Sequence, residues 1–512
     1  MASQISRRTG LQLGGAALAA STLGLPSAWA QNLDKNSLTI AYPADVPSWD
    51  PIAHTFPLAM SIFKTVFDSP LTQKPNLDIV ANVISKYAYK DPQTLELEFR
   101  SDVLFHNGDK FTAEDFKFTY QTRLRADDKL AISGVWKPIE DIEIKSPTQA
   151  VVHFNRPMPT AIAWWAFLGS FIVPKSYFEK VGGKEGFLKA PVGSGPYKLV
   201  DYQLGSRIVL EAFDKYWGHK AKIKRVIFEI VKDPSARVAA IQSKRVDIAT
   251  QVPIREAERL GKIKGLVARI EPETQIVLLQ LSNVDDTLKD ENVRLAMHHA
   301  INKEAISKAL FFGKAVPISV PATPGTPGYV KDFKFAYDEA KAKALLAKSG
   351  FSPSKPVKVK FQTTNGAFPN DYDIARAIAG MWKKVGIEAD VEVIELAKYY
   401  ELNHSRKLQG ATLYSWGNST GDPEMYTGYI LHPGLRFSAW KSDDMLEKLV
   451  PLFKEMDNAK RMAGYRDVAV YSVNKGYSIP LLQSVTTIIH RSELNYAPWK
   501  NGWVMPSYQT WK

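Results

Sequence analysis

The chain of 512 residues contains no cysteine. This absence excludes a disulfide framework, a thiolate metal site and a cysteine nucleophile. It also excludes the lipid-modified cysteine that anchors some exported proteins to a membrane. We therefore expect the protein to carry no lipid anchor and to diffuse freely in its compartment.

Long apolar runs are also missing. The most apolar stretch near the start, residues 11–25, is rich in Gly, Ser and Thr, and no later stretch reaches the roughly 18 apolar residues that a spanning helix needs. The sequence therefore predicts no membrane-spanning helix.

The first 30 residues have the features of a cleaved export signal. Arg7 and Arg8 precede the apolar run, and Ala28 and Ala30 are the small residues that signal peptidase prefers. The paired arginines are typical of twin-arginine export, but Gly10 stands where such signals usually have Phe or Leu. The general secretory route stays an alternative.

Basic residues exceed acidic ones, with a formal net charge of +13, yet no block of five or more basic residues occurs. The basic residues at 220–225 alternate with apolar ones, a pattern that indicates a solvated loop or strand edge. We expect no nucleic-acid partner.

Complete catalytic motifs are absent from the sequence as well. Two Ser-x-x-Lys patterns occur, at Ser61 with Lys64 and at Ser472 with Lys475, but the Ser-Asp-Asn and Lys-Thr-Gly elements of penicillin-recognising enzymes do not accompany them. No His-Glu-x-x-His, Walker A or Gly-x-Ser-x-Gly element is present. We predict that the protein is not an enzyme, with a periplasmic serine hydrolase as a remote alternative.

Histidines are scattered, and the adjacent pair His298 and His299 falls on a predicted helix. Neighbouring helical residues point to different faces, so the pair is a poor metal site. We expect neither a metal ion nor a cofactor.

Alternating helix and strand signals indicate an α/β protein. In the middle of the chain, Gly193, Gly195 and Pro196 predict a tight turn, Gly205 predicts a hairpin turn, and Asp233 before Pro234 predicts a helix start. The extended segments expected around these signals are 197–202, 207–213, 225–231 and 246–249.

The second half repeats the alternation. Asp338 predicts the start of a helix to Lys348, closed by Gly350, and Gly386 predicts the end of a helix over 374–385. Residues 411–416 are typical of an apolar strand, and 387–396 alternate as a further strand. Helices interleaved with strands favour a sheet covered by helices.

Five blocks, in order, carry a family resemblance: LTIAYPADVPSWDP from Leu38, VLFHNGDKFTAEDFKFTY from Val103, PVGSGPY from Pro191, YWG from Tyr216 with DIA from Asp247, and ENVRLAMHHAINKEAI from Glu291. These blocks resemble the peptide/nickel-binding family of solute-binding proteins of ABC importers. The resemblance extends over nearly all of the chain after Asn32.

The resemblance implies a type II periplasmic-binding-protein-like α/β fold of two lobes with an extra inserted domain, like that of cluster C. Residues 32–70, 190–282 and 485–512 would form a discontinuous lobe I, residues 71–189 the inserted domain, and residues 283–484 lobe II. No serial linker or internal repeat separates the domains in the sequence.

The strongest candidate for a ligand contact is Trp416 at the end of the predicted strand, followed by Asn418, Ser419 and Thr420 on a glycine-flanked loop. A flat apolar ring beside small polar groups is typical of ligand pockets. The alternative is that Trp416 closes the edge of the core. The resemblance places this loop at the cleft, and peptide binders of the family have an Asp where this chain has Ser419.

Further candidates are Asn365, Tyr42, Phe56, Arg436 and Phe437. The resemblance implies that these loop positions approach the ligand, although each of them could equally be structural. We interpret Trp164 and Trp165 as packing residues.

Together, these features predict a monomeric periplasmic receptor that closes by a hinge over a small solute, peptide-like or another small polar organic molecule. The receptor would deliver the solute to a membrane ABC permease with cytoplasmic ATPase subunits. An opine, a short oligosaccharide or a metal chelate are alternative ligands.

Overall fold

The computed structural model describes residues 34–130, 132–167, 169–418, 420–435 and 437–512. The predicted export signal, residues 1–30, lies outside them. The helices and strands belong to the unit Asn36–Lys512. No helix in the described residues is long and apolar enough to cross a membrane.

The main sheet of the described residues contains eleven strands and mixes parallel and antiparallel pairs. Their order is β15-β14-β16-β12-β17-β11-β1-β10-β9-β8, and β13 pairs with β17 outside this path. The strands are β1 (Ser37–Tyr42), β8 (Tyr197–Gln203), β9 (Arg207–Ala212), β10 (Arg225–Ile230), β11 (Ile248–Thr250), β12 (Leu266–Leu281), β13 (Val316–Pro317), β14 (Val357–Thr363), β15 (Ile387–Val393), β16 (Ala411–Gly417) and β17 (Ser478–Arg491).

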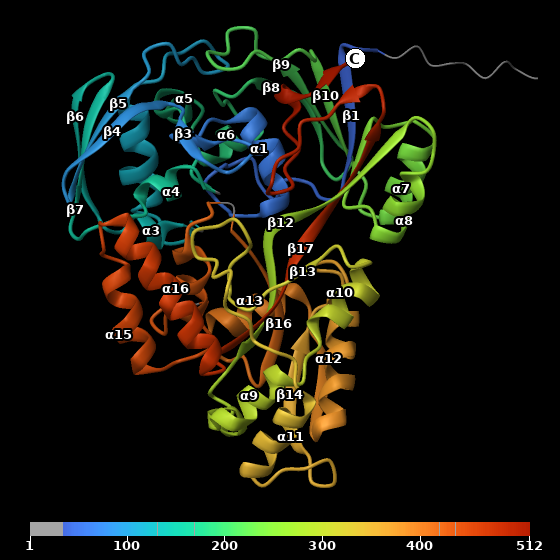
Figure 1. The fold of residues 1–512 in the computed structure, drawn as a ribbon. Coiled ribbons are helices and arrows are strands. Elements are labelled where there is room, and N and C mark those ends of the chain that lie inside the picture. Colours follow the sequence, from blue (N-terminus) through green and yellow to red (C-terminus); the bar gives the residue numbers. More distant parts are fainter. Residues whose placement is uncertain (1–33, 131, 168, 419, 436) are drawn as a thin grey trace, which may run out of the picture. The chain divides into compact units, whose positions relative to one another are not determined.

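Two long antiparallel strands, β12 and β17, run through the middle of this sheet (Figure 1). The first half of β12 pairs with the half of β17 that also pairs with β11, and the second half of β12 pairs with β16. The register shifts between Pro272 and Ile276. A local irregularity therefore separates the two halves of the strand pair.

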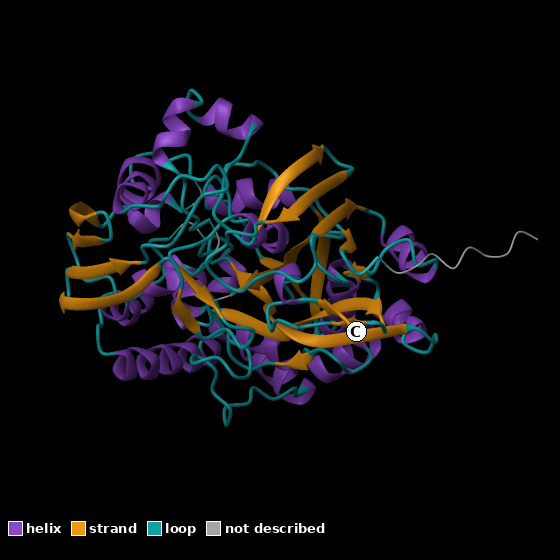
Figure 2. Cartoon of the chain, turned by 90° about the horizontal axis from the view of Figure 1, so that it is seen from above, coloured by secondary structure: helices purple, strands orange, loops and turns teal. Residues whose placement is uncertain are grey.

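A second sheet is formed by β4 (Ile84–Asp91), β5 (Thr94–Phe99), β7 (Gln149–Phe154) and β6 (Ile139–Ser146), all antiparallel. Figures 1 and 2 both show it apart from the main sheet. The surrounding elements are β2 (Leu71–Gln73), β3 (Ile79–Ala81), α2 (Ala113–Lys117), η2 (Phe118–Leu124), α3 (Ser133–Trp136), α4 (Ala161–Trp165), α5 (Lys175–Lys180) and α6 (Lys184–Lys189). All of them lie in the segment predicted as an inserted domain, residues 71–189, and the boundaries of that domain and of the two lobes stay predictions.

The remaining elements follow the main sheet in chain order. They are η1 (Pro57–Ala59), α1 (Met60–Val66), α7 (Pro234–Gln242), α8 (Ile254–Leu260), η3 (Asp286–Lys289), α9 (Glu291–His299), α10 (Lys303–Phe311), α11 (Glu339–Lys348), α12 (Asp371–Val385), α13 (Leu396–His404), η4 (Pro423–Met425), α14 (Thr427–Leu431), α15 (Asp443–Leu452), α16 (Asn458–Asn474), β18 (Leu494–Asn495), η5 (Pro506–Tyr508) and β19 (Thr510–Trp511).

The predicted helix ends are confirmed at the level of hydrogen bonds. The Asp233 side chain accepts from the Ala236 amide at 2.7 Å, and Asp338 accepts from the Lys341 amide at 2.8 Å. Gly386 ends α12 with a φ of 101°, which glycine adopts without strain. The strand predicted over 387–396 ends earlier, at Val393, because α13 begins at Leu396.

The prediction of a tight turn at Gly193 and Gly195 needs correction. These residues lie in an extended loop that crosses the end of α1, and the Gly195 amide donates to the Val66 carbonyl at 2.9 Å. A Cβ atom at Gly193 would lie 2.0 Å from that carbonyl oxygen. Close approach of two backbones, rather than a turn, requires glycine here.

Buried apolar side chains of the described residues gather into two large clusters. The first cluster extends from Leu38 through the segment around the second sheet, and the second extends from Ile254 to Val485. In the loop after β16, Met425 belongs to the first cluster and Tyr426 to the second. This loop is therefore a place where the two clusters meet.

Candidate functional site

The loop after β16 is organised by Asn418, which is fully buried. Its Oδ1 accepts hydrogen bonds from the Thr420 amide (3.1 Å), the Thr420 hydroxyl (2.8 Å) and the Gly421 amide (3.0 Å). Its Nδ2 donates to the Asp422 carbonyl at 2.8 Å. The polar groups of Asn418 are thus used within the loop, and the residue fixes the loop's shape.

Trp416 lies at the end of β16, where the sequence predicts it, and its side chain is 9% exposed. The indole Nε1 donates to the Met425 carbonyl at 2.6 Å. The ring packs edge to face on Phe437, with 5.3 Å between centroids. Trp416 therefore holds the far side of the loop and adds to the core of the second cluster.

A cluster of three charged side chains lies under this loop. Arg461, on α16, donates to both carboxylate oxygens of Asp422 at 2.7 and 2.6 Å and to Glu424 at 3.2 Å. Only 2% of the Arg461 side chain and 4% of the Glu424 side chain are exposed. One cation thus faces two carboxylates, leaving an excess negative charge inside the protein.

This arrangement shifts the pKa values of the cluster. Burial raises the pKa of Glu424 to about 7, although Arg461 opposes the shift, and the charge of Asp422 raises it further. Burial works against the Arg461 charge, but Asp422 and Glu424 outweigh it and raise the pKa of Arg461 above its ordinary value. Arg461 therefore stays a cation, and Glu424 is the group in the cluster that exchanges a proton near neutral pH.

The other wall of this site comes from α4 and the residue before it. The Thr160 hydroxyl donates to Glu424 Oε1 at 3.1 Å, across 264 residues of sequence. Trp164 packs against Tyr429, with 5.7 Å between ring centroids. A cavity of about 160 Å³ lies between these parts, lined by Thr160, Ala163, Trp164, Thr420, Asp422, Glu424 and Met425.

This cavity is smaller than the roughly 300 to 1,000 Å³ of common small-molecule sites. In the arrangement described, it has room for only part of a ligand. The site combines an aromatic wall, a hydroxyl pair and a buried carboxylate that can hold a proton, so it can recognise a polar molecule with an apolar part.

The loop between β14 and α12 carries Asn365, which is exposed. Asp371 fixes this loop, because its carboxylate accepts from the Thr364 hydroxyl at 2.8 Å and from the Gly366 and Ala367 amides at 2.9 Å each. Asp371 itself is 2% exposed. Asn365 is thus presented at the surface by a rigid turn.

The remaining predicted site residues fall into two groups. Tyr42 belongs to the first apolar cluster, where its hydroxyl donates to Ser61 Oγ at 3.1 Å and burial raises its pKa to about 12. Phe56 is half-buried against the same cluster, whereas the half-buried Phe437 packs with Trp416 in the second cluster. Ser419 and Arg436 lie outside the described residues.

The structure thus brings together Trp416, Asn418, Thr420 and Phe437. The contacts of Tyr42 and Phe56 lie in the other cluster, and Asn365 lies on a separate loop.

Four residues of the site have no counterpart among the sequence predictions: Thr160, Trp164, Glu424 and Arg461. Trp165 packs as expected, stacked on Trp136 at 5.7 Å, but Trp164 also lines the cavity beside polar groups. Polar residues do converge on Trp164, from a part of the chain far away in sequence. No local pattern around Trp164 or Arg461 signals this contact.

Neither Ser-x-x-Lys pattern forms a nucleophile with its base. Ser61 Oγ bonds the Tyr42 hydroxyl and the Val504 amide, while Lys64 Nζ donates to Ser69 Oγ and the Ala166 carbonyl. Ser472 donates to the Ala469 carbonyl. These contacts assign no general base to either serine.

Comparison with known proteins identifies relatives along most of the chain. The family model for bacterial extracellular solute-binding proteins, family 5 Middle, matches residues 79–436. The nickel-binding protein NikA of Staphylococcus aureus is 26% identical over 412 residues, which are 80% of this chain and 78% of that protein. The dipeptide-binding protein of Escherichia coli is 26% identical over 408 residues, 74% of this chain and 76% of that protein.

Solved structures share the fold at lower identity. DppA from Helicobacter pylori in complex with peptide STSA matches with a TM-score of 0.81 and 22% identity, over 93% of this chain and 98% of that one. NikA from Staphylococcus aureus in complex with Ni(L-His)2 matches with a TM-score of 0.77 and 21% identity, over 93% of this chain and 100% of that one. The similarity confirms the predicted two-lobed periplasmic-binding-protein fold.

Proposed function

Because the chain belongs to the bacterial extracellular solute-binding proteins of family 5, we propose that it is the receptor of an ABC importer. It captures a small solute in the periplasm and delivers it to a membrane permease that is driven by cytoplasmic ATPase subunits. The family match over residues 79–436 is the observation that carries this proposal. The receptor acts as a monomer, is exported by the twin-arginine or the general secretory route, and performs no catalysis.

Capture proceeds by hinge closure of two lobes over the solute. The irregular stretch of β12 between Pro272 and Ile276, opposite β17, is our proposed hinge. Hinges are a few positions that absorb backbone rotation while the packed parts move as bodies. A solute that contacts both lobes favours the closed state by its difference in affinity for the two states.

The solute contacts the loop after β16 and the residues around it. The contacts that we propose are Trp416, Asn418, Ser419, Thr420, Asn365, Tyr42, Phe56, Arg436 and Phe437. The internal bonds of Asn418 and Thr420 support a role for these two in shaping the loop, with backbone groups exposed to the solute. The burial of Tyr42 supports an indirect role for that residue.

The chemistry of the loop disfavours a solute with a positive charge at this end. In peptide binders of the family, an Asp at the position of Ser419 pairs with the peptide's amino group. Asp422 and Asp371 are the nearest acidic replacements in sequence, but Asp422 is paired with Arg461 and all oxygens of Asp371 accept hydrogen bonds. A buried ammonium without a counter-ion costs several kcal/mol.

We therefore propose a solute that is neutral or anionic near Ser419. Relatives bind, by their names, nickel, dipeptides, heme and glutathione, so the family accommodates very different solutes. An opine, a short oligosaccharide or a metal chelate fits this requirement better than a peptide with a free amino terminus.

The receptor proposal is tested by native mass spectrometry of freshly purified protein, followed by calorimetry with the solute that is found. A cognate solute at a hundredfold excess over Kd should stabilise the protein by about 2.7 kcal/mol, with a smaller radius of gyration in X-ray scattering. Stabilisation without compaction would contradict hinge closure. Labelling by a serine-reactive probe would favour the hydrolase alternative.

The charge proposal is tested with tripeptides that have free or acetylated amino termini. We expect both forms to bind weakly or not at all. Micromolar binding that requires the free amine would refute the proposal.

A further inference from the structure

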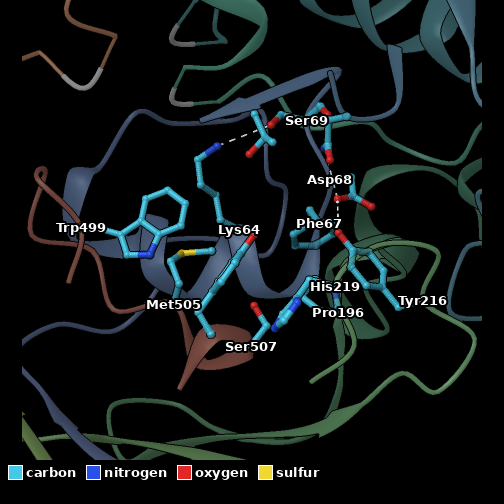
Figure 3. A pocket seen from close by; sticks show the side chains of 13 residues that line it. Lys64, Phe67, Asp68, Ser69, Pro196, Tyr216, His219, Trp499, Met505 and Ser507 are labelled. Atoms are coloured by element: carbon cyan, nitrogen blue, oxygen red, sulfur yellow. Dashed lines mark hydrogen bonds between the residues drawn. The ribbon is translucent and has the colours of Figure 1, made fainter. Parts of the chain in front are cut away.

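A second cavity lies on the other side of the molecule's contacts, around Lys64 of α1 (Figure 3). Its volume is about 480 Å³ including its open mouth. None of its lining residues lines the cavity under the loop after β16. They are Lys64, Phe67, Asp68, Ser69, Thr72, Asn82, Pro196, Tyr216, His219, Trp499, Met505, Ser507 and Tyr508.

Lys64 places a buried ammonium group at this cavity, with 7% of the residue exposed. Its Nζ donates to Ser69 Oγ at 3.5 Å and to the Ala166 carbonyl at 3.4 Å. Both distances exceed the 2.7 to about 3.2 Å of ordinary N–H···O bonds. Figure 3 shows the Lys64 side chain reaching toward Ser69. The ammonium is thus poorly compensated for the water that it has lost.

Asp68 lies nearby, but its hydrogen-bonding capacity is directed elsewhere. Its Oδ1 accepts from Asn82 at 3.3 Å and from the Tyr216 hydroxyl at 3.1 Å, and its Oδ2 accepts from Trp217 Nε1 at 3.2 Å. Its charge attracts the Lys64 ammonium, yet burial still lowers the pKa of Lys64 to about 8. Asp68 therefore does not replace a direct partner for Lys64.

We propose that this cavity is a binding site for a small organic carboxylate, whose charged group pairs with Lys64 and whose apolar part lies against Trp499 and Met505. Buried charges in proteins are normally paired, and the carboxylate supplies the missing hydrogen-bond acceptor. This site is separate from the solute cleft and does not depend on which solute is transported.

The walls fit such a ligand. Trp499, Met505 and Phe67 are apolar and at most 6% exposed, while the buried hydroxyls of Ser69 and Ser507 add polar groups. Apolar walls with a few placed polar groups are typical of small-molecule sites, and so is a volume of this order.

The exposed residues of the lining indicate where a ligand would enter. Tyr508 is 41% exposed, and its ring stacks on the exposed His219 with 4.9 Å between centroids. Both rings belong to segments outside the helices and long strands, so a small displacement of either is enough to admit a molecule of a few atoms.

Propionate is a suitable probe, and propionamide is its neutral counterpart of the same shape. Binding is measured by saturation-transfer NMR on the full-length mature protein, with Kd taken from a titration. We expect saturable binding of propionate and at least tenfold weaker binding of propionamide, because a charged hydrogen bond is about twice as strong as a neutral one and compensates the buried ammonium. Absence of saturable propionate binding, or equal affinity for the two probes, overturns the proposal.

Lys64→Met removes the charge and keeps the length of the side chain. We expect at least a tenfold loss of propionate affinity, and no loss in Lys74→Met, because Lys74 is exposed and does not line the cavity. Equal affinity in Lys64→Met and the wild type overturns the proposal.

Ser507→Leu provides an independent check that keeps Lys64. Ser507 is 3% exposed and lies on the opposite wall, so a leucine there occupies the space of the ligand. We expect propionate binding to be lost while the affinity for the transported solute stays the same. Retained propionate binding in this variant contradicts the site, even if Lys64→Met does not fold.

Discussion

The loop after β16 and the cavity beside Lys64 both contain buried charges, but the charges are neutralised in different ways. Arg461 makes three short bonds to Asp422 and Glu424, and the Thr160 hydroxyl bonds Glu424 from the other side. Lys64 makes two long bonds and faces open space.

The difference concerns what each region still needs. Around Arg461, the protein's own groups satisfy the charges and fix the loop in one shape, so a solute meets a prepared surface. Around Lys64, the protein leaves part of the hydrogen bonding unmade, and a ligand or water must complete it. Binding at the first region depends on geometry, and binding at the second depends on charge.

Replacing each cation by methionine should separate the two regions most clearly. Arg461→Met leaves two buried carboxylates without a cation, and we expect the free energy of unfolding to fall by about 3 to 5 kcal/mol. Lys64→Met removes a poorly paired charge and should change it by less than about 1 kcal/mol. Urea denaturation followed by circular dichroism measures both values.

The matched control for Arg461 is Arg466→Met on the same helix, because Arg466 makes one bond to the Pro327 carbonyl at the surface. We expect it to behave like other surface changes, within about 0.5 kcal/mol. Equal losses in the two arginine variants would mean that the charge cluster under the loop does not stabilise the fold.

Asn418→Ala tests whether the loop after β16 depends on one side chain. The change leaves the Thr420 and Gly421 amides without their acceptor, and we expect a loss of about 3 kcal/mol, since each buried orphan group costs about 1 to 3 kcal/mol. Thermal and urea denaturation measure it. Asn365→Ala is the control, because Asn365 is exposed on the other loop. A loss below that of the control would show that the loop keeps its shape without Asn418.

Trp416 combines a loop contact with a proposed solute contact, and two substitutions distinguish them. Trp416→Phe keeps an aromatic ring but removes the bond to the Met425 carbonyl, so we expect a loss of stability of about 1.5 kcal/mol. Trp416→Ala should also weaken solute binding roughly tenfold, because stacking adds about 0.5 to 1.5 kcal/mol beyond buried area. Calorimetry with the cognate solute measures the second effect. Unchanged affinity in Trp416→Ala would assign the indole to the core alone.

The comparison also shows what sequence patterns can and cannot predict here. Asp233 and Asp338 are recognisable as helix caps because a cap bonds an amide three residues further on. Gly386 is recognisable because the end of a helix needs a left-handed residue. Such interactions are local, and the helices and strands around them were predictable for that reason.

The charge cluster was not predictable, because its members are far apart in sequence. Arg461 lies 39 residues from Asp422, and Thr160 lies 264 residues from Glu424. The position of the loop follows from Trp416 and the glycines after it, but the role of Asn418 depends on bonds that no spacing rule requires. The sequence therefore predicts where the site lies better than it predicts which atoms are available to a solute.

Protonation of Glu424 gives the smallest expected effect and tests the charge count around Arg461. Burial raises its pKa from 4.5 to about 7, so the folded protein keeps a proton that the unfolded chain has already lost in this interval. The folded state is favoured at low pH, and this contribution disappears as the pH rises through about 7. Glu424→Gln cannot lose the proton and keeps the shape of the side chain. From about pH 5 to about pH 8, wild-type stability should therefore fall relative to Glu424→Gln by on the order of 1 kcal/mol. Glu447→Gln, at an exposed position of α15, should show no such trend. Parallel pH profiles of the wild type and Glu424→Gln would mean that Arg461 neutralises both carboxylates, and that the site holds no excess negative charge near neutral pH.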